Sequence, residues 1–216
     1  MSRKSKRNRQ NPGELAPEAR SAGRTWIVYA AIAALVLAVV TGSLLYKRET
    51  PPAEPGAEQA ALASTHSPTL GDAAAKVHIV EFIDPACETC AAFFPLVKQV
   101  MAENPGRIRL SIRHVAFHSG SDYVVRLLEA SRKQDKYWQT LDALLASQAQ
   151  WTANHTVQPE RVGLAIAGVG LNVEQLMTDM NSPEVAERIR KDANDAVTLK
   201  VTATPEYFVN GRSLPS

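Results

Sequence analysis

The sequence predicts an α/β domain with a helical insertion, preceded by one transmembrane helix. Three observations predict this architecture. Residues 26–46 form a run without charge, residues 77–115 follow a strand–helix–strand pattern, and residues 120–199 have helical periodicity before a final hairpin signal. A strand–helix–strand unit of this length implies two parallel strands joined by a right-handed crossover.

The composition is that of a globular protein with an uneven charge distribution. The chain has 216 residues, of which 45% are hydrophobic and 21% charged, which excludes collagen-like, wholly disordered and disulfide-dense classes. Residues 1–24 carry seven Lys and Arg against two Glu, although the net charge of the whole chain is only +2. The rest of the chain is therefore net negative, and we expect no nucleic-acid partner.

The uncharged run is interpreted as a membrane anchor. Its 21 residues span about 31 Å as a helix, the thickness of a hydrocarbon core. Basic residues are concentrated in the tail 1–25, which predicts a cytoplasmic N-terminus and a single-pass protein of the bacterial inner (cytoplasmic) membrane. The domain beyond residue 48 is then in the periplasm or outside the cell. A cleaved signal peptide is the main alternative, but its apolar region is usually shorter. A buried soluble helix should show a polar stripe, which is absent.

A linker and a folded domain follow the predicted anchor. Residues 47–68 contain four Pro and few large apolar residues, so we expect a Pro-rich linker without regular structure. The domain is predicted over residues 69–216, with the helical insertion at about 120–199.

The first half of the domain is predicted from hydrophobic patterns. Residues 77–83 are β-branched and apolar, which favours a strand ended by Asp84 and Pro85. A helix with Pro95 inside it follows, and residues 107–115 alternate polar and apolar residues as a second strand.

Capping and turn residues delimit the second half. Ser121, Asn172 and Ser182 are expected to cap insertion helices. Residues 206–209 predict a strand, and Asn210 with Gly211 predicts a hairpin turn.

Cys87 and Cys90 are the only cysteines, and the pattern places them at the start of a helix. A helix N-terminus stabilises a thiolate, which is the nucleophile of disulfide exchange, and a second thiol one turn later can resolve a mixed disulfide. A structural bridge would close too small a loop to add much stability. Metal binding is the other alternative, because His114 and His118 could join the cysteines in a soft-metal site, but the spacing matches no standard motif.

Two segments resemble the thioredoxin superfamily. Val80 to Cys90, VEFIDPACETC, is similar to its strand and active-site segment, and the helical block resembles the DsbA-type branch. Val201 to Gly211, VTATPEYFVNG, is similar to the loop, strand and hairpin that carry its cis-proline. The resemblance covers residues 67–216 and implies a thioredoxin-like fold.

The resemblance also implies roles for five residues. Cys87 matches the nucleophilic cysteine and Cys90 the resolving one. Glu81 matches a buried acid that moves a proton to and from the second cysteine, although a carboxylate facing water is the alternative. Pro205 matches the cis-proline beside the disulfide, and Thr204 would offer its backbone to an extended substrate.

The implied activity is that of a protein thiol–disulfide oxidoreductase acting outside the cytoplasm, in the direction of disulfide formation. Its partners would be protein or peptide thiols and a membrane redox partner. We expect no cofactor beyond the Cys87–Cys90 disulfide and no metal. Two alternatives remain open: a reductase for a dedicated client, and a copper-binding or chaperone module that uses the cysteines as ligands.

Two features depart from the family pattern. Glu88 and Thr89, between the cysteines, supply no basic group, and Glu88 should raise the pKa of a nearby thiol. The sequence also stops at Ser216, before the final strand and helix that the family would add. We therefore expect either a C-terminally truncated domain or a sheet with one face left uncovered.

Overall fold

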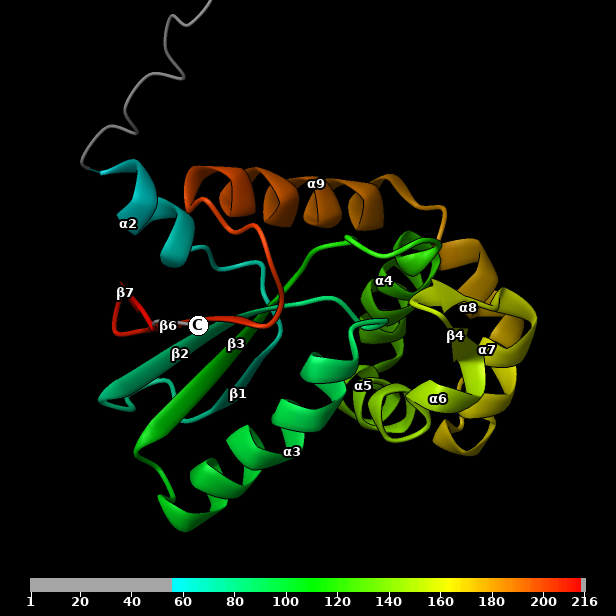
Figure 1. Cartoon of the computed structure of the whole chain (residues 1–216), viewed down its shortest axis with the longest axis horizontal. Coiled ribbons are helices and arrows are strands. Elements are labelled where there is room, and N and C mark those ends of the chain that lie inside the picture. Colours follow the sequence, from blue (N-terminus) through cyan, green and yellow to red (C-terminus); the bar gives the residue numbers. More distant parts are fainter. Residues whose placement is uncertain (1–55, 215–216) are drawn as a thin grey trace, which may run out of the picture. The chain divides into compact units, whose positions relative to one another are not determined.

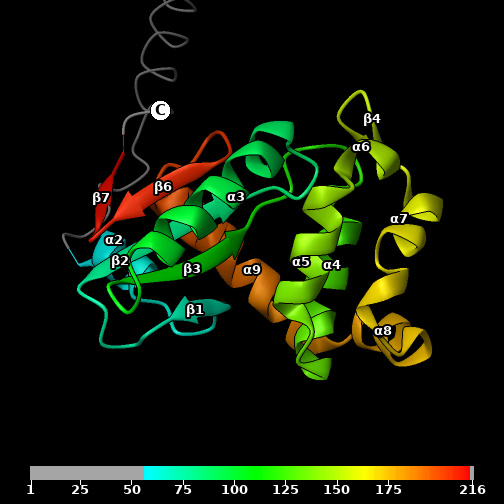
Figure 2. The same ribbon diagram turned by 90° about the horizontal axis from the view of Figure 1, so that it is seen from below.

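The computed structural model describes residues 56–214, which form a five-stranded sheet with helices on both faces (Figures 1 and 2). The predicted tail, the anchor at 26–46 and residues 47–55 of the predicted linker lie outside the described residues. Among the helices of residues 56–214, none combines the length and the apolar character needed to cross a bilayer.

The sheet has the order β1-β3-β2-β6-β7. Its strands are β1 (Thr69–Gly71), β2 (Val77–Ile83), β3 (Ile108–His114), β6 (Glu206–Val209) and β7 (Arg212–Ser213). The β2 and β3 strands are parallel, as the strand–helix–strand pattern predicts, and β6 runs antiparallel to β2. The thioredoxin-like α/β fold is thereby confirmed.

Helices cover the two faces of the sheet differently. Helix α3 (Glu88–Glu103) lies on one face, and α9 (Pro183–Thr198) with α2 (Ala57–Leu62) lies on the other (Figure 1). Alternation along β2 sends Ile83 toward the α3 side and Phe82 toward the α9 side, into separate apolar clusters. Three large apolar side chains of α3 remain about half exposed: Phe93, Leu96 and Val100.

Residues 121–179 of the predicted insertion lie beside the sheet and are mostly helical (Figure 2), whereas its last helix, α9, covers a face of the sheet, so the predicted bounds of 120–199 are too wide. The helices of residues 121–179 are α4 (Ser121–Ser131), α5 (Tyr137–Ala146), α6 (Gln148–Trp151), α7 (Pro159–Ala165) and α8 (Val173–Asp179), with 3-10 turns at Arg132–Gln134 and Ala167–Val169. We expected the insertion to contain only helices, and this prediction is wrong at one place. A small hairpin of β4 (Thr152–Ala153) and β5 (Thr156–Val157) interrupts the insertion.

The prediction that residues 47–68 lack regular structure is wrong in the C-terminal part of this segment. Residues 57–62 form α2, in which Ala61 is buried, and α2 packs against α9. Pro68 is also buried, and its carbonyl accepts a hydrogen bond from the Ile112 amide. The segment is ordered because it covers the α9 side of the sheet, a tertiary contact that its Ala-rich and polar sequence does not reveal.

Two of the three predicted caps are confirmed. The side chains of Asn172 and Ser182 accept hydrogen bonds from backbone amides at the starts of α8 and α9. The cap predicted at Ser121 is wrong, because Gly120 occupies that position with φ +75°. The Ser121 hydroxyl instead donates to buried Asp84.

Candidate active site

The two cysteines lie where β2 leads into α3. Cys87 is the N-cap of α3 and has an extended backbone, and Cys90 lies in the first helical turn. Cys87 is 6% exposed, whereas Cys90 is fully buried. The sulfur of Cys87 is therefore the one nearer to solvent, and both residues are free cysteines in this structure.

The surroundings of the two thiols separate their pKa values. A hydrogen bond from the Cys90 thiol lowers the pKa of Cys87 to about 5, against the opposing effect of burial, and contacts with Thr204 and the backbone at Thr89 and Cys90 act in the same direction. The same hydrogen bond, together with burial, raises the pKa of Cys90 far above its usual range. Cys87 is thus the thiolate of the pair at neutral pH.

Buried Asp84 holds the loop that carries Cys87. One carboxylate oxygen accepts from the Ala86 amide at 2.8 Å and from the Ser121 hydroxyl. The other accepts from the Phe117 amide at 2.7 Å, and from the amide and Nδ1 of His118 at 2.9 and 2.8 Å. These bonds tie the loop to the segment after β3. The sequence marked Asp84 only as the end of a strand.

The loop before β6 completes the site. The Thr204–Pro205 peptide bond is cis. The Cys87 sulfur lies 3.3 Å from the Thr204 carbonyl oxygen. Residues 202–203 of the same loop are exposed. The structure therefore brings Thr204 and Pro205 together with Cys87, although they lie more than 110 positions apart in the chain.

Glu81 is buried on the α3 side of β2. Its side chain is fully shielded from solvent, and Oε2 has no hydrogen-bond partner. Oε1 accepts a bond of 3.1 Å from the hydroxyl of Tyr207 on β6. Burial raises the pKa of Glu81 to about 8, although the Tyr207 hydrogen bond opposes the shift. The alternative of a carboxylate facing water is excluded, and Glu81 carries a proton at neutral pH.

A further contact with the active-site loop comes from the insertion and was not predicted. The Gln148 amide nitrogen donates to the carbonyls of Pro85 and Cys87 at 2.7 and 2.9 Å. Gln148 begins α6 and is 5% exposed. The sequence shows Gln148 only as a polar residue in a segment with a helical pattern, and such residues are usually exposed to solvent.

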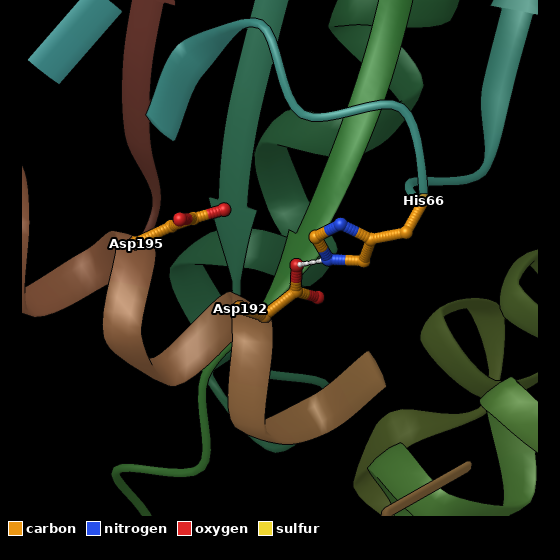
Figure 3. Close-up of side chains that lie close together, drawn as sticks. All are labelled: His66, Asp192 and Asp195. Atoms are coloured by element: carbon orange, nitrogen blue, oxygen red, sulfur yellow. Dashed lines mark hydrogen bonds and ion pairs between the residues drawn. The ribbon is translucent and has the colours of Figure 1, made fainter. Parts of the chain in front are cut away.

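A second cluster of titratable groups lies away from the cysteines, on the α9 side (Figure 3). One ligand atom each from His66, Asp192 and Asp195 falls within 4.8 Å of the others. The Arg113 guanidinium already lies among them: Nη1 is 3.2 Å from Asp192 Oδ1 and also contacts Asp195. An arginine in this position makes the cluster an ion-pair network that ties β3 to α9.

The cysteine site meets the requirements of thiol–disulfide exchange. It holds one thiolate, a second thiol within hydrogen-bond reach and an exposed loop beside the reactive sulfur, and a buried carboxyl group with a raised pKa lies on the neighbouring strand β2. The fold and the site together define a thiol–disulfide oxidoreductase.

Comparisons with known proteins identify the family. The family model described as Thioredoxin matches residues 63–215. The chain therefore belongs to the thioredoxin family, and its relatives identify it as a DsbA-type member of that superfamily.

Three relatives illustrate the similarity. A probable disulfide bond formation protein D of Bacillus anthracis is 28% identical over 82% of this chain and 84% of its own length. A thioredoxin-like oxidoreductase from Silicibacter pomeroyi superposes with a TM-score of 0.63 and 28% identity, over 73% of this chain and 88% of that one. A Na(+)/H(+) antiporter NhaA of Herminiimonas arsenicoxydans is 31% identical over 65% of this chain, but the match spans only 22% of the antiporter.

Proposed function

We propose that the protein forms disulfides in protein or peptide thiols outside the cytoplasm. The observation that carries this proposal is the lowered pKa of Cys87, about 5. A stabilised thiolate favours the reduced form of the Cys87–Cys90 pair, and a pair that prefers to be reduced oxidises its substrates. The oxidation direction is therefore favoured over the reductase alternative.

The proposed reaction begins with the Cys87–Cys90 disulfide, and no cofactor other than this disulfide takes part. A substrate thiolate attacks the Cys87 sulfur, a new sulfur–sulfur bond forms, and Cys90 leaves with the electron pair. Glu81 is protonated at neutral pH and lies on the same face of the sheet, so it supplies the proton that Cys90 takes up. The second substrate thiolate then attacks the substrate sulfur of the mixed disulfide. Cys87 leaves as a thiolate, and two electrons have passed from the substrate to the enzyme.

Thr204 and Pro205 are proposed to bind the substrate. The Thr204 carbonyl is 3.3 Å from the Cys87 sulfur, so a polypeptide joined to Cys87 must pass along this loop. The exposed residues 202–203 beside it allow an extended segment to pair with the backbone.

The location and the redox partner belong to the same proposal. The uncharged segment 26–46 and the basic tail before it support a single-pass protein of the bacterial inner membrane, with the catalytic domain in the periplasm. Thiols in that compartment are oxidised and disulfides persist. A membrane redox partner would accept the two electrons from reduced Cys87 and Cys90.

The reduction potential of the cysteine pair tests the proposed direction. The full-length protein is equilibrated with glutathione buffers, and the oxidised fraction is measured by alkylation. We expect a value nearer to about −120 mV, typical of a strong disulfide oxidant, than to about −270 mV, typical of a thioredoxin. A value at the thioredoxin end would favour the reductase alternative.

A further inference from the structure

The residue that follows Cys87 should weaken it as a nucleophile. Glu88 is exposed, and a carboxylate next to a thiolate raises the free energy of the charged form. Yet the thiolate form of Cys87 is strongly favoured, and the dipeptide Glu88–Thr89 contains no basic group. A basic group that pairs with the Glu88 carboxylate would therefore have to come from elsewhere in the fold.

Such a group comes from the helical insertion. The Nδ1 atom of His155 lies 2.8 Å from Oε2 of Glu88. His155 occupies the turn between β4 and β5, and this hairpin is fixed to the segment after β3, since the Val157 amide donates to the Ser119 carbonyl at 2.9 Å. The imidazole is thus delivered to the active site by an anchored hairpin.

The backbone conformation at His155 in this turn is one that favours glycine. Asn154 and His155 have φ values of +49° and +58°, the left-handed conformation of a two-residue hairpin turn. Glycine is strongly preferred at the second position of such turns, because a side chain there is strained. His155 therefore occupies a position at which the turn geometry alone favours glycine.

A second imidazole holds the first in place. The rings of His118 and His155 stack with centroids 5.4 Å apart and planes 25° apart. His118 in turn pairs with buried Asp84 at 2.8 Å. The ionisable groups facing His155 are therefore Glu88 from α3 and His118 from the segment after β3, with Asp84 behind His118. Each imidazole therefore has its own carboxylate partner, and the two rings pack against each other.

We propose that His155 is a positioning residue that neutralises Glu88 and thereby keeps Cys87 reactive. It supplies from the helical insertion the basic group that the Cys-Glu-Thr-Cys sequence lacks. The inference rests on the proposed role of Cys87 as nucleophile. It also makes the insertion part of the redox chemistry, since the position of the β4–β5 hairpin then sets the oxidising strength.

A double-mutant cycle in the full-length protein tests this coupling. The variants are His155→Gln, Glu88→Gln and their combination, with His155→Gly as a second variant that relieves the turn. The control is Arg190→Gln, which breaks an equally exposed ion pair with Glu187 on α9. Thiolate absorbance during a pH titration gives the pKa of Cys87, and glutathione equilibria give the redox equilibrium constant.

Both His155 variants should make the pair a weaker oxidant. At about pH 6, we expect the equilibrium with glutathione to shift about threefold toward the oxidised protein, the size of an exposed ion pair. The pKa of Cys87 should rise in parallel. Glu88→Gln should shift both quantities the opposite way, and adding His155→Gln to it should change little. Arg190→Gln should match the wild type.

Three results would overturn the inference. Equal effects of His155→Gln with and without Glu88 would show that His155 does not act through Glu88. A Cys87 pKa that stays low in both His155 variants would show that His155 has only a structural role, and the proposed function would survive. A wild-type Cys87 that titrates like an ordinary thiol would remove the basis of both proposals.

Discussion

Glu81 combines complete burial with an incomplete set of hydrogen bonds. One carboxylate oxygen has no partner and the other has only the Tyr207 hydroxyl, so ionisation inside the sheet is costly. Burial accordingly raises the pKa of Glu81 to about 8. A carboxyl that keeps its proton at neutral pH can donate it to a departing thiolate, and this property also makes the stability of the protein depend on pH.

The variant Glu81→Gln should remove part of that pH dependence. Between the ordinary pKa of 4.5 and about 8, the folded protein holds a proton on Glu81 that the unfolded chain has lost, so stability falls as pH rises through this window. The wild type should lose on the order of 5 kcal/mol relative to Glu81→Gln across it. Denaturant unfolding at a series of pH values gives the difference curve.

The neighbouring tyrosine provides a matched control for this experiment. Because the Tyr207 hydrogen bond lowers the pKa of Glu81, Tyr207→Phe should extend the loss of stability to higher pH while its onset near the ordinary pKa stays unchanged. Parallel stability curves for the wild type and Glu81→Gln would show that Glu81 is ionised throughout, and the proposed proton transfer would lose its donor.

At the scale of elements, buried charges join the insertion to the sheet. Glu129 on α4 is 1% exposed, and its Oε2 lies 2.8 Å from both Arg132 Nη1 and Arg188 Nε. Its Oε1 is 3.3 Å from Nδ1 of His114 on β3. Burial alone would raise the pKa of Glu129, but the hydrogen bond and charge of His114, together with Arg132, lower it to about 2. Helices α4 and α9 and strand β3 therefore meet at one carboxylate.

Replacing this carboxylate should loosen the insertion. We expect Glu129→Gln to lower the free energy of unfolding by about 3–5 kcal/mol at neutral pH, because two arginines lose their buried partner. A lowered carboxyl pKa contributes stability above the ordinary value of 4.5, and this contribution is lost as pH falls toward 2. The gap between wild type and variant should therefore narrow in acid, as measured by denaturant unfolding.

An exposed acid on the insertion serves as the control for Glu129. Glu160→Gln on α7 removes a carboxylate at the surface and should change stability by less than about 0.5 kcal/mol. If Glu129→Gln is as stable as this control, the attraction within the buried ion pairs only offsets the free-energy cost of removing these charges from water.

Elements with a sequence period were predictable, and short ones were not. Strands β2 and β3 and helix α3 each carry a full hydrophobic pattern, and the Asn-Gly turn marks the β6–β7 hairpin. Strands β1, β4 and β5 have two or three residues, which is too few to show a period. Helix α2 has one buried residue among its six. Such elements form because the rest of the fold offers partners.

The same distinction applies to the site. Cys87, Cys90 and the loop at Pro205 stand in local motifs, and the family resemblance implied the burial of Glu81. The contact between His155 and Glu88 depends instead on how a hairpin of the insertion packs against α3. Nothing in the local sequence around His155 indicates this contact.

At the scale of the described domain, the two halves share the active-site loop. The sheet half provides the strand, the helix and the cis-proline loop. The insertion provides Gln148, which holds the carbonyls of Pro85 and Cys87, and His155, which contacts Glu88. Redox strength in this protein is therefore expected to depend on the relative position of both halves, beyond the identity of the residues between the cysteines.

The proposed reaction direction requires that this domain lie outside the cytoplasm, which makes membrane topology the last prediction. Alkaline phosphatase fused after the last residue should be active, since the basic residues before segment 26–46 favour a cytoplasmic N-terminus. The fusion should remain in the membrane fraction after alkaline extraction.

Leu35→Arg with Leu37→Arg should prevent insertion, because each arginine at a helix centre costs about 2.5–3.5 kcal/mol. The matched control, Leu35→Ala with Leu37→Ala, should insert normally. An active but soluble and shortened product would replace the anchor with a cleaved signal peptide, and an inactive fusion would contradict the proposed compartment.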